Sequence, residues 1–219
     1  MKPIIVKVSS DLLEKWLKAW SLSRNLSLPV QYKSGFKVKV GDEKQKERYI
    51  FSEPNKDFFQ LSHTIDEPWI YLKVCSGPDL FINNIPEKWQ LQPQGYMMNC
   101  SHPMNIQQLN LPEGYIVEYS NEDYMFIVKI ITPKGEQAAI GRVIFVDDIA
   151  VYDRIVTEEN HRRKGLASFI IKELEKNAVS KNIFKNFLVA TEEGKLLYEA
   201  LGWKVYSLYT SVVIPAFKT

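Results

Sequence analysis

The stretch Thr157-Glu-Glu-Asn-His-Arg-Arg-Lys-Gly-Leu-Ala167 decides the fold of this chain, because it joins two segments of different periodicity. Before it, residues 149–157 are rich in β-branched side chains, which favour a strand. After it, apolar residues recur at helical spacing, and charged residues take the other side. The apolar positions are Leu166, Ala167, Ile170, Ile171, Leu174 and Ala178. The sequence therefore predicts a strand, a basic glycine-bearing loop and an amphipathic helix in direct succession.

The loop itself has the chemistry of an anion site. The first N–H groups of a helix have no internal partner, and the helix dipole makes that end positive. Gly165 lets the backbone come close to a ligand, while Arg162, Arg163 and Lys164 add positive charge. These features predict a pyrophosphate site. An ordinary strand-to-helix turn with a basic surface is the alternative interpretation.

Two motifs carry a family resemblance. The pattern Arg162-x-x-Gly165-x-Ala167, between such a strand and helix, resembles the acyl-CoA pyrophosphate loop of the GNAT N-acyltransferase superfamily. Thr191-Glu-Glu-Gly-Lys-Leu-Leu-Tyr-Glu-Ala-Leu-Gly-Trp203 resembles the family's late helix and turn, Asn-x-x-Ala-x-x-Leu-Tyr-x-x-Leu-Gly-Phe. Thr191 and Gly194 depart from the usual Asn and Ala, which affects the contact from that loop to the cofactor rather than the fold. The resemblance covers roughly the last half of the chain.

The expected fold class is α+β. The order of elements in the second half is ββββαβαβ, with residues 204–215 expected to form a final pair of strands. This order predicts the GNAT fold, a mixed and mostly antiparallel sheet with helices on both faces. A smaller α+β domain is expected to precede it.

The resemblance also implies a co-substrate and its ligands. It implies acetyl-CoA and no metal. Main-chain groups of Ile155 and Thr157 would pair with the pantetheine arm as another strand would. Backbone N–H groups of the loop and first helical turn would hold the pyrophosphate. The implied cofactor-binding residues are Ile155, Val156, Thr157, Arg162, Arg163, Lys164, Gly165, Leu166, Ala167 and Ser168.

The resemblance implies that Tyr198 protonates the leaving thiolate, since a phenol donates a proton yet is neutral at physiological pH. The alternative for Tyr198 is a packing role on an amphipathic helix. Asp153 is the candidate base for the attacking amine, because strand alternation would place it on one face with Ile155 and Thr157. A salt bridge with Arg142 or Arg154 is the alternative for Asp153.

Two domains are expected, residues 1–105 and residues 106–219. The first has helix and strand patterns but lacks both motifs, so we expect an acceptor-side domain or a degenerate GNAT-like copy. In most GNAT domains two helices that help build the acceptor pocket lie between the first two strands. Here residues 114–119 lead through Asn121-Glu-Asp123 directly into residues 124–131, which leaves no room for these helices.

The composition limits the binding partners and the cellular compartment that are expected for this chain. The chain has 219 residues, 25% of them charged, with a net charge of +2, so bulk charge implies no nucleic-acid partner. No apolar run reaches the roughly 20 residues that span a bilayer, so no membrane role is expected. Cys75 and Cys100 are expected to be reduced core residues of a cytoplasmic protein. A homodimer is compatible with the exposed sheet edge that this fold leaves.

These features point to three function classes. The first is an N-acetyltransferase acting on a primary amine of a small molecule, amino acid or peptide. The second is a non-catalytic acyl-CoA-binding module with a regulatory or interaction role. The third, a Rossmann-like nucleotide binder, predicts a Gly-x-Gly-x-x-Gly loop near an early strand, which the chain lacks. Tyr198 and the complete Arg162/Gly165/Ala167 loop favour the enzyme.

Overall fold

The computed structural model describes residues 7–105 and 110–216, and these form two compact units. The first unit comprises the chain up to Met98, together with Val189–Leu196 and the segment that begins at Val205. The second unit comprises Asn99–Leu188 and Leu197–Lys204. Each unit contains strands and at least one amphipathic helix.

The first unit begins with helix α1, Ser10–Leu22, whose N-terminus is capped by the Ser9 side chain. Its sheet has the order β1-β2-β3-β4-β12, and β5 pairs with β12. Helix α2, Lys56–Thr64, joins β3 to β4, and these two strands are parallel. The strands are β1 Val30–Tyr32, β2 Gly35–Asp42, β3 Gln45–Phe51, β4 Ile70–Val74, β5 Gln90–Leu91, β6 Gly95–Cys100 and β12 Lys204–Val213. Two 3-10 helices, η1 Pro78–Leu80 and η2 Ile82–Asn84, follow β4.

An aromatic core holds α2 against this sheet. Phe58 of α2 is fully buried and meets Phe51 and Phe81 edge to face, with ring centroids 5.8 and 5.1 Å apart. Edge-to-face contacts of this kind add about 0.5–1.5 kcal/mol each to the area that they bury. The amphipathic pattern of residues 55–65 therefore forms a helix because it has an apolar sheet face to cover.

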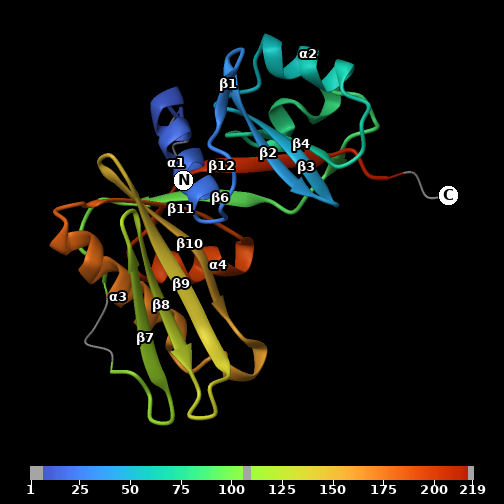
Figure 1. Ribbon diagram of the computed structural model, residues 1–219. Helices are drawn as coiled ribbons and strands as arrows, with labels where there is room; N and C mark the ends of the chain where they lie inside the picture. The colour runs from blue at the N-terminus through green and yellow to red at the C-terminus, as the bar shows by residue number, and fades with distance from the viewer. Residues whose placement is uncertain (1–6, 106–109, 217–219) are drawn as a thin grey trace. The chain divides into compact units, whose positions relative to one another are not determined.

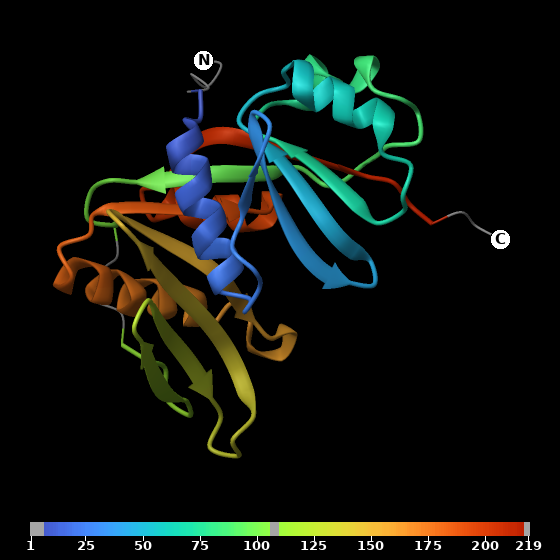
Figure 2. The same cartoon turned by 45° about the horizontal axis from the view of Figure 1, so that its top comes forward.

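The second unit is built around an antiparallel meander that the sequence predicts. Strands β7 to β10 pair in chain order, and β11 runs parallel to β10. Helix α3 packs along β8, β9 and β10, as both views show (Figure 1, Figure 2). The elements that lie wholly or partly in this unit after residue 110 are β7 Ile116–Glu122, β8 Met125–Ile131, β9 Gln137–Val146, β10 Ile149–Thr157, η3 Glu159–His161, α3 Leu166–Ser180, β11 Lys185–Ala190 and α4 Glu192–Ala200. Strand β12 follows α4 in the chain, so the order from β7 onward is ββββαβαβ, as predicted, and the mixed, mostly antiparallel sheet is confirmed.

The end of the chain differs from the sequence-based prediction. Residues 204–215 were expected to form two strands, but Lys204–Val213 is one continuous strand, β12. It pairs with β4 in antiparallel register, Thr210 opposite Val74, and so belongs to the first unit. A local pattern shows that a segment is extended but not which distant strand it joins. For this reason the two units are not the contiguous segments 1–105 and 106–219, and that functional division stays a prediction.

Both units contain the same supersecondary element. In the first unit β3, α2 and β4 form a parallel β-α-β element, as β10, α3 and β11 do in the second. The hypothesis that the first half is a diverged copy of the second stays a prediction, because the two elements share only their order and their parallel pairing. The chain therefore has two corners at which a strand leads into a helix, from β3 into α2 and from β10 into α3. Only the second corner has the basic glycine loop.

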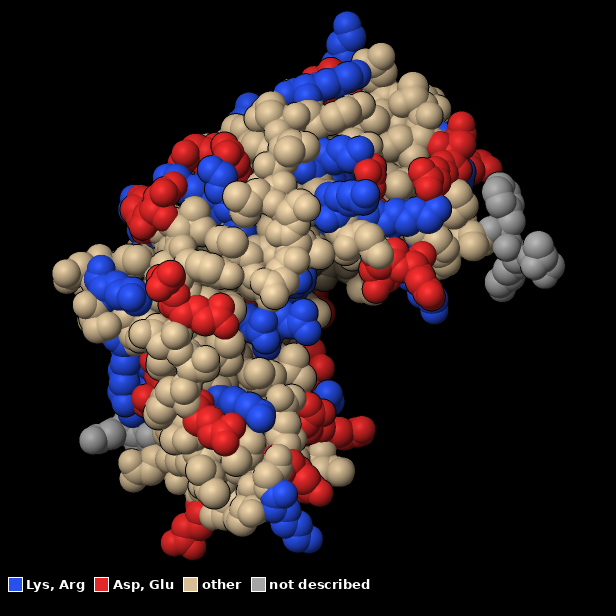
Figure 3. Space-filling view, viewed as in Figure 1, with Lys and Arg blue, Asp and Glu red and all other residues tan. Residues whose placement is uncertain are grey.

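The described surface mixes both charges. On the face shown in Figure 3, lysine and arginine are interspersed with aspartate and glutamate. Cys75 and Cys100 are both free and buried, as expected. Within residues 7–105 and 110–216, none of the helices combines the length and the apolar character needed to cross a bilayer.

Candidate active site

The candidate site begins where strand β10 leaves its neighbour. Strand β10 pairs with β11 at Ile149, Ala150 and Val151, and the described register goes no further. On its other edge β10 stays paired with β9 as far as Thr157, which is opposite Ala139. One edge of β10 between residues 153 and 157 is therefore not bonded to β11. An unpaired strand edge presents N–H and C=O groups that an extended ligand arm can bind.

A β-bulge in this open stretch corrects the predicted position of Asp153. Between Asp153 and Val156 the strand advances three residues while β9 advances two, from Arg142 to Ile140, and Arg154 has a φ of +52°. Such an extra residue reverses the alternation of side chains.

The two faces of β10 can be identified from their neighbours. Tyr152 interacts electrostatically with Glu175 of α3, and the Ile155 side chain lies beside Gly141, as Ile170 of α3 does. Both therefore face α3, although they are three residues apart. Asp153, next to Tyr152, points to the opposite face and does not share the face of Ile155 and Thr157. The prediction that Asp153 shares a face with Ile155 and Thr157 was wrong, because the local sequence does not show the bulge.

The basic loop ends in a helix terminus that is open to a ligand. Gly165 is the N-cap of α3 with a φ of +76°, and no side chain caps the helix. The first turn of α3 holds no acidic residue. A Cβ placed on Gly165 would meet no described atom within 4 Å, so the space in front of the terminus is open. Arg163 is also left-handed, with a φ of +61°. These features fit a pyrophosphate, whose charge the exposed N–H groups and the dipole would stabilise.

The equivalent corner of the first unit lacks this opening. There the Asn55 side chain accepts a hydrogen bond from the Phe58 N–H at 3.1 Å and caps α2. Asp57 adds a negative charge in the first turn. An anion at that corner would have to displace the Asn55 side chain, and the Asp57 carboxylate would repel it. Of the two β-α-β elements, the one that carries the predicted motif is the one suited to an anion.

The predicted cofactor residues lie together around this terminus. Arg162, Arg163 and Lys164 are exposed, whereas Leu166 is buried, so Leu166 can offer its N–H but not its side chain. Val156 is 48% exposed on the open strand. The carbonyl of Thr157 accepts a 3.4 Å bond from Arg162 Nε, so this carbonyl already has a partner within the loop. Ile155, Ala167 and Ser168 complete the predicted set and are half-buried.

Tyr198 lies on α4 in an enclosed environment. Its ring meets Trp203 at 5.7 Å, and Trp203 in turn meets Tyr152 at 5.3 Å. Trp203 also donates from Nε1 to the Met104 sulfur at 3.3 Å. Gly202 allows this turn by adopting a φ of +94°. The Leu-Gly-aromatic end of the motif therefore positions Tyr198 by packing, and Trp203 is a positioning residue that sequence reasoning did not single out.

The electrostatics link the two candidate catalytic residues. Burial raises the pKa of the Tyr198 phenol well above its usual value, and the negative charge of Asp153 raises this pKa further. The structure thus brings Tyr198 and Asp153 within electrostatic range, although they are 45 positions apart (198 minus 153). Thr191 replaces the usual asparagine of the motif, and its Oγ1 caps α4 by accepting from the Gly194 N–H at 3.1 Å.

The loop has a further support that the sequence did not indicate. Tyr115, which directly precedes β7, bonds through its hydroxyl to His161 Nδ1 at 2.8 Å and to Lys164 Nζ at 3.1 Å. It is 46 residues from His161, and no local signal connects the two. Among the described residues, no three His, Cys, Asp or Glu side chains gather closely enough to hold a metal ion.

Comparison with known families agrees with this geometry. The model of the acetyltransferase (GNAT) family matches residues 92–203, more than half of the chain, and the chain belongs to that family. None of the curated proteins matches the sequence.

Solved structures show the same fold. A GCN5-related N-acetyltransferase from Kribbella flavida is similar with a TM-score of 0.61 and 11% identity, over 90% of this chain and 93% of its own. A tandem GNAT protein from the clavulanic acid biosynthesis pathway has a TM-score of 0.59 and 12% identity, over 85% and 80%. A GNAT-family protein from Novosphingobium aromaticivorans, described as a putative acetyltransferase, has a TM-score of 0.59 and 13% identity, over 94% and 97%. At these identities the likeness shows the fold alone.

Proposed function

We propose that this protein is an N-acetyltransferase that moves an acetyl group from acetyl-CoA to a primary amine of a small molecule, amino acid or peptide by direct attack. The observation that carries this proposal is the open N-terminus of α3, which follows a strand with one unpaired edge. An extended thiol arm ending in a pyrophosphate needs these two features side by side. Membership of the GNAT family supports the same class of reaction.

Each end of the co-substrate has a matching part of the site. The N–H groups from Arg163 to Ala167 would bind the pyrophosphate, with the side chains of Arg162 and Lys164 adding charge. The backbone groups of Ile155 and Thr157 at the open edge of β10 would align the arm, and the Thr157 carbonyl has a second lone pair besides the one that accepts from Arg162. Acetyl-CoA, when bound, supplies a thioester that an amine can attack.

Tyr198 and Asp153 are the proposed proton-transfer groups. Asp153, directly or through a water molecule, would take a proton from the amine before attack. Tyr198 would donate its phenolic proton to the departing sulfur. Because burial and the charge of Asp153 raise its pKa, the phenol stays protonated at neutral and mildly alkaline pH. A backbone N–H of the bulged strand is a suitable donor to the developing oxyanion.

The direct test is thiol release from acetyl-CoA over a panel of primary amines, comparing the wild type with Tyr198→Phe. The phenylalanine variant keeps the packing on Trp203 and loses only the acidic proton. We expect kcat to fall by roughly 100- to 10,000-fold, the range typical of a lost general acid, with the Kd for acetyl-CoA unchanged. Unchanged turnover in Tyr198→Phe would remove Tyr198 from the chemistry. Saturable binding with no thiol release for any amine would favour the non-catalytic binding module.

A further inference from the structure

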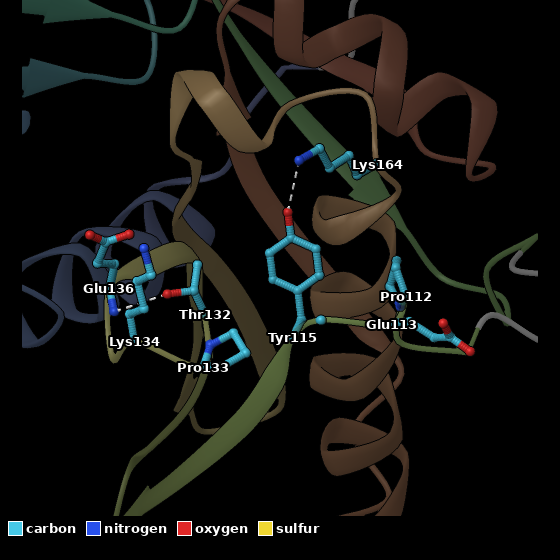
Figure 4. A pocket seen from close by; sticks show the side chains of 9 residues that line it. Pro112, Glu113, Tyr115, Thr132, Pro133, Lys134, Glu136 and Lys164 are labelled. Carbon is cyan, nitrogen blue, oxygen red and sulfur yellow. Dashed lines mark hydrogen bonds between the residues drawn. The ribbon is translucent and has the colours of Figure 1, made fainter.

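Helix α3 makes polar contacts near both ends of the proposed site. At its start, the Tyr115 hydroxyl is directed at the Lys164 ammonium, 3.1 Å away, beside the basic loop (Figure 4). Further along the helix, Glu175 is half-buried and bonds to the segment of chain that precedes the meander. The proposed chemistry gives no task to Glu175, although a carboxylate that is withdrawn from water is costly unless it is bonded.

Glu175 anchors the segment that contains Met104. The Met104 N–H donates to Glu175 Oε1 at 2.7 Å, across 71 positions of sequence. Burial raises the pKa of the Glu175 carboxyl, and the bond from the Met104 N–H opposes that rise. A hydrogen bond to an ionised acceptor is roughly twice as strong as one between neutral groups. The carboxylate and the segment therefore hold each other in place.

The Met104 segment in turn supports the Leu-Gly turn that follows α4. The Met104 sulfur accepts from Trp203 Nε1 at 3.3 Å, and the Asn105 N–H donates to the Leu201 carbonyl at 3.0 Å. The Asn105 side chain also lies against Gly202, where a Cβ would meet its amide nitrogen at 3.5 Å. Two hydrogen bonds and one packing contact thus fix this turn from a segment that lies outside both sequence motifs.

The same turn sets the position of Tyr198. The Trp203 N–H donates to the Tyr198 carbonyl at 3.0 Å, and the two ring centroids are 5.7 Å apart. The Trp203 ring also meets Tyr152, whose buried hydroxyl has no hydrogen-bond partner in the described part of the chain. An indole has a single donor, so Met104 is the polar partner that orients the Trp203 ring.

We infer that Glu175 is a positioning residue for Tyr198, the proposed general acid. It acts through Met104, which it holds by the backbone N–H, and through Trp203, which Met104 orients. The inference rests on the proposed function, because it concerns the step in which Tyr198 protonates the leaving thiolate. All of these residues belong to the second unit. Helix α3 thereby relates the acid to the loop at its own N-terminus, as a supporting residue must if a catalytic group is to keep its geometry.

The test compares kcat, from thiol release, and the Kd for acetyl-CoA in Glu175→Leu, Glu175→Gln and the matched control Glu173→Leu. Leucine removes the acceptor of the Met104 N–H, whereas glutamine keeps a carbonyl oxygen. Glu173 lies on the same helix and accepts from the Tyr119 hydroxyl at 3.1 Å, so its replacement also breaks a bond to a distant strand. We expect the kcat of Glu175→Leu to fall about tenfold, within the roughly 100-fold that a displacement of about 1 Å can cost. The Kd should stay unchanged, Glu175→Gln should keep most of the turnover, and Glu173→Leu should match the wild type.

A double-mutant cycle tests the path through Trp203. Trp203→Phe keeps an aromatic ring beside Tyr198 and loses the donor to the Met104 sulfur. If Glu175 acts through this contact, the double variant with Glu175→Leu should be no slower than the slower single variant. The indole N–H signal of Trp203 in the NMR spectrum gives a second measurement, which we expect to shift in Glu175→Leu and in Glu175→Gln but not in Glu173→Leu.

The outcomes separate this inference from the proposed function. An unchanged kcat in Glu175→Leu, an equal loss in Glu173→Leu, or losses that multiply in the double variant would overturn the role of Glu175. If Glu175→Leu does not fold, Glu175→Gln decides the matter, because an unshifted Trp203 indole signal in that variant would overturn the link. Absence of thiol release by the wild type with every amine would instead contradict the proposed function, and the indole signal would still test whether Glu175 holds Trp203.

Discussion

Gly165→Glu is the substitution that tests the anion site most sharply. It places a carboxylate at the N-cap of α3, where the carboxylate can itself accept from the helix N–H groups and where it repels a pyrophosphate. Two unit charges about 4 Å apart repel by roughly 1 kcal/mol in water and by about 4 kcal/mol at the effective dielectric of a protein surface. Since each 1.4 kcal/mol changes Kd tenfold, acetyl-CoA binding should weaken by about fivefold to 700-fold.

Gly41→Glu is its matched control. Gly41 has a φ of +75° against +76° for Gly165, and at both positions a Cβ would meet no described atom within 4 Å. Each substitution should therefore cost about 1–2 kcal/mol of stability through the left-handed backbone, with no steric clash. At Gly165 a capping contact of the new carboxylate should offset part of this cost. Denaturant unfolding measures the stability of each variant, and calorimetry with acetyl-CoA measures the difference in binding. Affinities for the two variants within threefold of each other would refute the placement of the pyrophosphate at Gly165.

Two further predictions concern buried titratable groups. Burial raises the pKa of the Cys75 thiol to about 12 and also raises the pKa of the Cys100 thiol. Neither thiol should therefore react with a disulfide reagent at pH 8 until guanidinium unfolds the chain. Rapid labelling of the native protein would contradict their burial. Burial also raises the pKa of Glu175, whose carboxylate accepts from the Met104 N–H at 2.7 Å, so the folded state binds the proton more tightly than the unfolded chain. Its charged form therefore opposes folding at neutral pH, and this cost disappears below the unfolded pKa near 4.5. Glu175→Gln should raise stability at pH 7 and lose that advantage on acidification, whereas Glu199→Gln, at an exposed position, should change little; a gain that does not depend on pH would exclude this cause.

Local periodicity was sufficient for most elements of the fold. The strand before the basic loop was expected at residues 149–157 and is β10, Ile149–Thr157; the apolar positions from Leu166 to Ala178 all lie in α3. Strand β10 and helix α3 can each be predicted from a side-chain pattern within one continuous segment. Strand β12 was misjudged because its partners, β4 and β5, lie more than a hundred residues earlier.

The candidate site was predictable where the backbone is regular and not where it is irregular. Gly165 follows from the motif, since a helix that begins at a glycine leaves its N–H groups uncovered. The direction of Asp153 depends on one extra residue at a bulge, and alternation of side chains cannot show it. Tyr115 reaches the loop only through the folded sheet, so no spacing in the sequence indicates it.

Calorimetric titration of the purified protein with acetyl-CoA, with CoA and NAD as comparisons, tests the proposed co-substrate site most directly. We expect saturable binding of acetyl-CoA and of CoA at one site per chain, with no heat of binding for NAD. Absence of acetyl-CoA binding, or equal binding of NAD, would contradict the assignment of the α3 terminus as a coenzyme A pyrophosphate site.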